Sequence, residues 1–123
     1  MFKIENKQIH ITRGDVGCID ITAKNDDMTD YQFQVGDVVR LSVYKKKDCN
    51  VVELQKDVTV EKVTTNVEIN LVSEDTKIGS SINIPTDYWY EIELNPDTKP
   101  QTIIGYDIDG PKLFTIYPEA SGR

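Results

Sequence analysis

Histidine and cysteine are scarce in this sequence, which has one histidine, His10, and two cysteines, Cys18 and Cys49, in 123 residues. Any Ser-His-Asp or Cys-His catalytic arrangement would have to pass through His10. This residue alternates with Ile9 and Ile11, so we interpret it as a solvent-facing strand residue and not as a catalytic base. We therefore assign no catalytic residue and expect a protein that is not an enzyme.

Metal-ligand patterns are also lacking. Neither cysteine has a second ligand at the short spacing of zinc sites, which argues against zinc. Asp107-Ile108-Asp109-Gly110 is similar to the opening of a calcium loop, but Pro118 stands where the loop's bidentate acid is expected. We predict no metal and no cofactor. Without an export signal, the two cysteines are interpreted as reduced packing residues, with a single disulfide between them as the alternative.

Long apolar runs and an excess of basic residues are missing too. No segment approaches the roughly 20 apolar residues that span a bilayer, and Met1–Glu5 lacks the apolar core of a signal peptide. Fourteen basic and twenty-one acidic residues give a net charge of -7, which repels a phosphate backbone. The sequence thus predicts neither a membrane nor a nucleic-acid partner, and synthesis in a cytoplasm.

What the sequence does contain is an ordinary globular composition, with 38% hydrophobic and 28% charged residues. A chain of this length forms one domain with one core. We place that domain at residues 1–118 and interpret residues 119–123 as a small, polar, disordered tail.

The clearest alternation surrounds Tyr88–Leu94, which we predict to be a central strand in a hairpin with residues 101–108. Tyr90, Ile92 and Leu94 share one face of this strand. Trp89 and its acidic neighbours share the other. The pattern predicts one apolar face that packs in the core and a second face that carries Trp89 and acidic residues.

Similar short alternating segments recur along the chain, separated by turn formers that include Gly14, Gly36 and Gly110. Ser73–Gly79 breaks the pattern and predicts either one helical turn or a compact loop, and Gly105 predicts a bulge. The fold class that follows is all-β, an antiparallel, immunoglobulin-like β-sandwich of about 7 to 9 strands. The further strands are expected at residues 9–11, 19–21, 31–33, 38–46, 51–58, 66–71 and 113–117.

Trp89 is the residue most suggestive of a binding surface. An outward tryptophan beside carboxylates is either an interface anchor or a platform on which a sugar ring stacks. The alternative is that Trp89 packs beneath the loop Ile78–Pro85, as large aromatic residues often do. Glu91 and Glu93 lie two residues apart on one strand with no second wall to hold a sugar, so we interpret them as a solvated face and not as a glycosidase pair.

Three segments together resemble a known group of proteins. They are Ile11–Asp15 (Ile-Thr-Arg-Gly-Asp), Gln34–Lys46 (Gln-Val-Gly-Asp-Val-Val-Arg-Leu-Ser-Val-Tyr-Lys-Lys), and Tyr88–Leu94 followed by Thr102–Gly105. Their order and spacing are similar to those of small phage and prophage virion proteins of Gram-positive bacteria, in particular β-sandwich modules of the tail or baseplate. The resemblance covers most of the chain and implies assembly without catalysis.

The leading hypothesis is therefore a non-enzymatic structural module of a phage or prophage particle. Its partners would be other virion proteins or copies of itself, as a homo-oligomer. Its location would be the virion, or the bacterial host cytoplasm when it is expressed from a prophage. The alternative is a carbohydrate-binding β-sandwich that holds a glycan on exposed aromatic residues. Under either hypothesis the contact residues are expected to be Trp89, Tyr88 and Tyr106.

Overall fold

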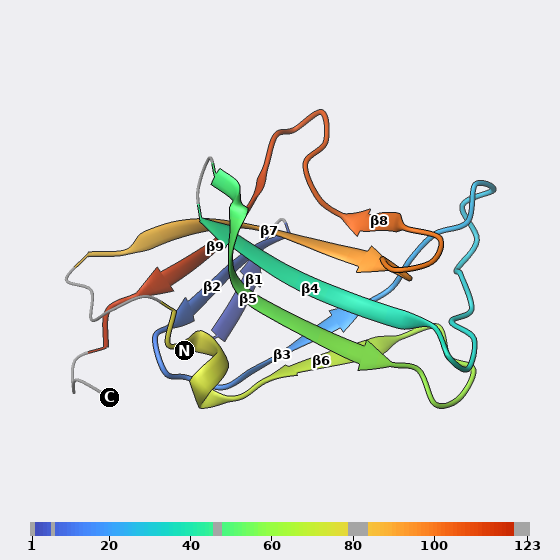
Figure 1. Ribbon diagram of the computed structural model, residues 1–123, viewed down its shortest axis with the longest axis horizontal. Coiled ribbons are helices and arrows are strands. Elements are labelled where there is room, and N and C mark those ends of the chain that lie inside the picture. Colours follow the sequence, from blue (N-terminus) through green and yellow to red (C-terminus); the bar gives the residue numbers. More distant parts are fainter. Residues whose placement is uncertain (1, 6, 46–47, 79–83, 120–123) are drawn as a thin grey trace.

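The computed structural model describes residues 2–5, 7–45, 48–78 and 84–119, and these residues form an all-β fold with one short 3-10 helix (Figure 1). The predicted fold class is confirmed, and the helix lies inside the segment predicted to form a helical turn. In chain order the elements are β1 (Phe2–Glu5), β2 (Gln8–Thr12), β3 (Gly17–Ile21), β4 (Val38–Lys45), β5 (Asp48–Thr59), β6 (Val67–Leu71), η1 (Ser73–Thr76), β7 (Thr86–Leu94), β8 (Gln101–Ile104) and β9 (Lys112–Tyr117).

Strand β7 is the centre of the larger sheet, as predicted. Seven strands form this sheet in the order β1-β2-β9-β7-β4-β5, with β8 also paired to β7. One edge of β7 pairs with β4, while the other edge pairs first with β9, over Thr86–Tyr90, and then with β8, over Ile92–Leu94. Because β8 and β9 share one edge of β7, the chain between them must leave the sheet plane. It forms the loop that rises above the sheet in Figure 1.

One strand pair departs from the antiparallel expectation. β2 runs parallel to β9, with Ile9 opposite Phe114 and Ile11 opposite Ile116. About a hundred residues separate the two strands in the sequence, so no tight turn imposes an antiparallel pairing on them. Local alternation predicts that both are strands but carries no information on their relative direction.

The core lies between the larger sheet and the two-stranded sheet of β3 and β6. Alternate residues of β2, β3, β4, β6, β7 and β9 are buried in a single hydrophobic cluster, as the period of two requires. From the small sheet come Ile19, Ile21, Val67, Ile69 and Leu71, and from the centre of the large sheet come Val39, Leu41, Val43, Tyr88, Tyr90, Ile92 and Leu94. The large sheet therefore has one face in the core and an outer face turned away from β3 and β6.

Helix η1 is fastened to the turn between β2 and β3 through Thr76, whose side chain is fully buried. The Thr76 hydroxyl accepts a hydrogen bond from the Gly14 amide at 2.9 Å and donates one to the Asp15 carbonyl at 2.8 Å. Gly14 has a φ of 86°, which only glycine adopts without strain. The predicted turn at Gly14 is confirmed, and its conformation allows the chain to meet the helix.

Three local expectations differ from the structure. Residues 31–33 are not a strand: the Phe33 side chain is fully buried, but its backbone makes only one isolated bridge, to Thr64. The irregularity predicted at Gly105 lies within β8, where the pairing with β7 shifts between Ile92 and Glu93. Glu119, assigned to the tail, forms an ion pair with Arg13 at 3.2 Å with its side chain only 3% exposed, while residues 120–123 lie outside the described part.

The described residues contain no helix long and apolar enough to cross a membrane.

Candidate functional site

The alternation of β7 separates the three residues predicted to form a contact surface. Tyr88 lies on the core face and is 9% exposed, so the prediction that it shares a surface with the other two is wrong. Trp89 lies on the outer face and is half-buried, and Tyr106, in the loop after β8, is 71% exposed. The structure brings Trp89 and Tyr106 together, with ring centroids 5.8 Å apart and ring planes at 63°.

The loop between β8 and β9 is held in place above Trp89 by its own hydrogen bonds. Asp107 and Gly110 exchange two backbone hydrogen bonds, of 3.2 and 2.9 Å, and Gly110 has a φ of 94°. The buried Lys112 ammonium donates to Asp107 Oδ1 at 2.7 Å and to the Gly110 carbonyl at 3.2 Å. The hydrogen bonds from Lys112 and from the Asp109 amide lower the pKa of Asp107. The turn predicted here is confirmed, and it presents Tyr106 in a fixed position.

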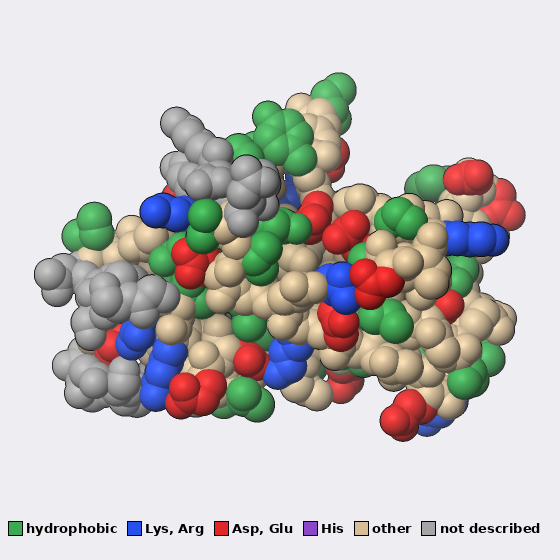
Figure 2. Space-filling view, in the orientation of Figure 1, with side chains coloured by type: hydrophobic (Ala, Val, Ile, Leu, Met, Phe, Trp, Pro, Cys, Tyr) green, Lys and Arg blue, Asp and Glu red, His purple; other side chains and the backbone are tan. Residues whose placement is uncertain are grey.

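Gly105 determines how closely this loop approaches the sheet. A Cβ atom at this position would lie 2.8 Å from Thr102 Cγ2 and 3.6 Å from Glu91 Cβ. The first distance is shorter than two carbon atoms tolerate, so a larger residue would displace the start of the loop. Figure 2 shows hydrophobic side chains gathered on the projecting loop, where Tyr106 and the fully exposed Ile108 lie.

Between this loop and strands β4 and β7 there is a small cleft of about 160 Å³, which we call the Trp89 cleft. Its apolar walls are aromatic rings and a proline, and its polar side chains carry a hydroxyl, a carboxylate and an ammonium group. The residues that supply these groups are Tyr44, Trp89, Glu91, Tyr106, Pro111 and Lys112. The combination of rings with a few convergent polar groups is typical of binding sites.

Polar groups in the Trp89 cleft are incompletely satisfied. The Tyr44 hydroxyl donates to Glu91 Oε1 at 2.7 Å, and burial together with this hydrogen bond raises the pKa of Tyr44 to about 12. Trp89 Nε1 is buried and has no hydrogen-bond acceptor among the described residues. A buried donor without an acceptor costs about 1–3 kcal/mol of folding free energy. The unpaired indole N–H therefore does not stabilise the fold.

The carboxylates beside the cleft take part in no ion pair within 4 Å among the described residues. Burial and then the charge of Glu91 raise the pKa of Glu93, because two neighbouring carboxylates disfavour their joint ionisation. The charge of Arg40, which lies opposite Glu93 on β4, offsets part of this rise. Arg40 itself pairs with Asp57 at 2.7 Å and with Asp97 at 3.0 Å. Negative charge therefore exceeds positive charge around these residues of the outer face.

The aromatic residues of the cleft do not form the flat surface on which a sugar ring would stack. Trp89 and Tyr106 meet edge to face, at 63°, and do not form the coplanar pair that the carbohydrate hypothesis requires. Of the predicted covering loop Ile78–Pro85, residues 79–83 lie outside the described part. What covers one side of Trp89 is the loop after β8, which sequence reasoning did not place above it.

The single histidine lies away from the cleft. His10 is half-buried on β2, and its Nδ1 lies 3.0 Å from the hydroxyl of Tyr117. A tyrosine hydroxyl at this distance can orient the imidazole but is not the serine or cysteine nucleophile of a catalytic triad. The contact between His10 and Tyr117 links the side chains of the paired strands β2 and β9.

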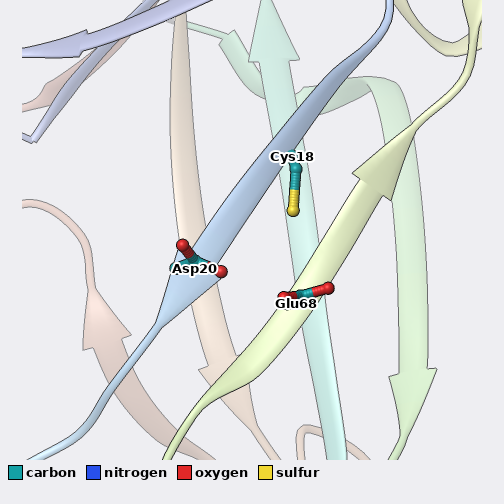
Figure 3. Close-up of side chains that lie close together, drawn as sticks. All are labelled: Cys18, Asp20 and Glu68. Carbon is teal, nitrogen blue, oxygen red and sulfur yellow. The ribbon is translucent and has the colours of Figure 1, made fainter.

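The structure reveals one cluster that sequence spacing did not predict. Cys18, Asp20 and Glu68 lie on the outer surface of the small sheet, and their ligand atoms all lie within 4.8 Å of one another (Figure 3). Cys18 is a free thiol, and partial burial and then the charges of Glu68 and Asp20 raise its pKa. The cluster needs the pairing of Asp20 with Glu68 across β3 and β6. The side chain of Cys49 lies outside the described part.

In comparisons with known proteins, the chain matches no model of a protein family, no curated protein and no solved structure. Its function therefore has to be inferred from its own residues and their geometry.

Proposed function

We propose that this chain is a non-enzymatic structural module of a phage or prophage particle, in the tail or baseplate, and that it acts through protein-protein contacts made by the outer face of its large sheet. The Trp89 cleft carries the proposal. It combines an exposed tyrosine, a half-buried tryptophan and one buried indole N–H without an acceptor among the described residues. Tryptophan, tyrosine and unsatisfied hydrogen-bonding groups concentrate where a second protein completes the surface.

The biological setting comes from the resemblance of three segments to tail and baseplate modules: Ile11–Asp15, Gln34–Lys46, and Tyr88–Leu94 with Thr102–Gly105. Two of these segments contain the strands that build the cleft, β4 and β7, and the third forms the turn that receives η1. The proposed location is the virion, or the cytoplasm of the bacterial host during assembly. The partners are neighbouring virion proteins or further copies of the chain.

Co-expression is the direct test of this function. The chain, carrying an affinity tag, is produced together with the products of the genes on either side of its own, and the eluted material is weighed by light scattering over a range of concentrations. We expect a defined complex, either of the chain with a neighbouring product or of several copies. Elution of a lone monomer from every co-expression would contradict the proposal.

A matched pair of variants ties that result to the cleft. Tyr106→Ala removes an aromatic ring from the cleft, whereas Ile108→Ala removes a fully exposed apolar side chain from the same loop. We expect the first variant to lose the complex and the second to keep it. If both variants lose the complex, or if neither does, the cleft is not the surface through which the complex forms.

Carbohydrate binding is the second candidate, because tryptophan, tyrosine and a carboxylate also occur together in sugar sites. The edge-to-face arrangement of Trp89 and Tyr106 leaves it without the flat platform it needs. A glycan array probed with the purified chain tests it independently of assembly.

A further inference from the structure

We propose that the Trp89 cleft is a receptor for an arginine side chain carried by a polypeptide segment of the partner protein. This inference rests on the proposed function, since it names the chemistry by which the outer face would recognise its partner. Three features of the cleft lead to it: the charge beside it, the aromatic walls and the unpaired indole N–H.

Charge selects a cation. Glu91 lines the cleft, Glu93 lies next to it on the same face, and no described ion pair within 4 Å includes either residue. Two described cations that lie opposite this part of β7, Lys112 and Arg40, are already bound. Lys112 is held by Asp107 and the Gly110 carbonyl, and Arg40 by Asp57 and Asp97. A cation from another molecule would thus meet a pair of neighbouring carboxylates, one of which accepts a hydrogen bond from the Tyr44 hydroxyl.

The aromatic walls favour arginine over lysine. A guanidinium group is planar and less strongly hydrated than an ammonium group, so it packs against an aromatic ring while its edge donates hydrogen bonds to a carboxylate. Trp89 and Tyr106 stand at 63° to each other, and Glu91 lies on the same strand two residues from Trp89. A volume of about 160 Å³ suits a single side chain and no larger group.

The indole N–H indicates that the occupant also carries an acceptor. Trp89 Nε1 is buried without a partner, and a guanidinium group has donors only. A backbone carbonyl of the segment that carries the arginine would satisfy this donor. A peptide therefore accounts for the whole site, whereas an inorganic cation accounts only for the carboxylates.

The single tryptophan of the chain makes the proposal directly measurable. Its indole N–H gives one signal in the ¹H-¹⁵N spectrum of the labelled full-length chain. The probes are the capped tripeptide Gly-Arg-Gly and its counterpart with citrulline, which has the same shape without the charge. We expect the arginine peptide to shift the indole signal with saturation and the citrulline peptide to bind at least about tenfold more weakly.

Two charge variants provide the matched control. Glu91→Gln keeps an acceptor for Tyr44 but removes the charge, and it should weaken binding of the arginine peptide about tenfold. Glu68→Gln removes the same charge from the opposite sheet and should leave binding unchanged. An indole signal that does not move at tens of millimolar peptide, that moves equally with citrulline, or that is equally affected by both variants overturns the proposal. A shift caused by a mono- or oligosaccharide, with none from the arginine peptide, overturns it in favour of a glycan site.

The two proposals fail in distinguishable ways. A chain that assembles with its neighbours but ignores the arginine peptide retains the proposed function and loses this inference. A chain that binds the arginine peptide through Glu91 but assembles with nothing retains the arginine site and loses the virion role.

Discussion

The two faces of β7 are made by the same nine residues and differ in every property that relates to folding. On the inner face Tyr88, Tyr90, Ile92 and Leu94 are at most 9% exposed and belong to one apolar cluster. On the outer face Trp89, Glu91 and Glu93 are half-buried, the indole N–H is unpaired, and burial together with the charge of Glu91 raises the pKa of Glu93. Folding accounts for the inner face. The outer face contains features that lower the stability of the fold, and such features are typical of binding surfaces.

Truncating the inner face should give the largest effect. Ile92→Ala removes a fully buried side chain from the centre of the core and should lower the free energy of unfolding by about 2–5 kcal/mol. Urea denaturation followed by circular dichroism measures it. Glu91→Gln, one residue away on the outer face, should change stability by less than about 0.5 kcal/mol. Comparable losses from the two variants would show that the outer face is also structural.

A smaller effect is expected where the loop touches the sheet. Gly105→Ala places a Cβ atom 2.8 Å from Thr102 Cγ2 and should cost about 1–2 kcal/mol of unfolding free energy. Thr102→Ser removes the opposing methyl group, so the double variant should recover most of that loss. If the double variant is no more stable than Gly105→Ala alone, the contact with Thr102 is not what requires glycine.

The paired carboxylates should give a small effect that depends on pH. Because the folded-state pKa of Glu93 is raised, its ionisation disfavours the fold, and stability rises as the pH falls through the folded pKa towards the unfolded value of about 4.3. Glu93→Gln should therefore be more stable than the wild type by a few tenths of a kcal/mol at pH 7. Denaturation curves at pH 7 and pH 4 should show this advantage disappearing in acid. An advantage of the same size at both pH values would exclude the carboxylate repulsion.

The smallest effect on stability is predicted for Tyr106→Ala, because a side chain that is 71% exposed contributes little to the core. The change should stay within about 0.5 kcal/mol, while binding of the arginine peptide falls about tenfold as one wall of the cleft is lost. Ile108→Ala should alter neither quantity. A large loss of stability in Tyr106→Ala would mean that the ring belongs to the fold.

Alternation along the chain was enough to predict which residues of β7 and β4 enter the core and where the turns at Gly14, Gly36 and Gly110 lie. It was not enough for features that depend on how distant segments meet. Phe33 is buried like a strand residue, but a single bridge to Thr64 replaces a ladder. The parallel pairing of β2 with β9 has no local signature.

The candidate site was predicted only in part for the same reason. Trp89 and Tyr106 stand out as aromatic residues near turns, but their contact depends on β8 and β9 sharing one edge of β7. The prediction of Tyr88 failed although the period of two already placed it with Tyr90. The cluster of Cys18, Asp20 and Glu68 required the register between two strands that are 48 residues apart at the Asp20–Glu68 pair.

The central claim, that the outer face of β7 at Trp89 is a contact surface, is tested most directly by the environment of that indole before and after assembly. The chain alone is labelled with 5-fluorotryptophan, and its single ¹⁹F resonance is recorded free and in the complex recovered by co-expression. We predict that the resonance shifts on assembly and that its response to replacing H₂O with D₂O decreases, because the partner excludes solvent from the cleft. A resonance with the same position and the same solvent response in the free chain and in the complex would contradict the claim.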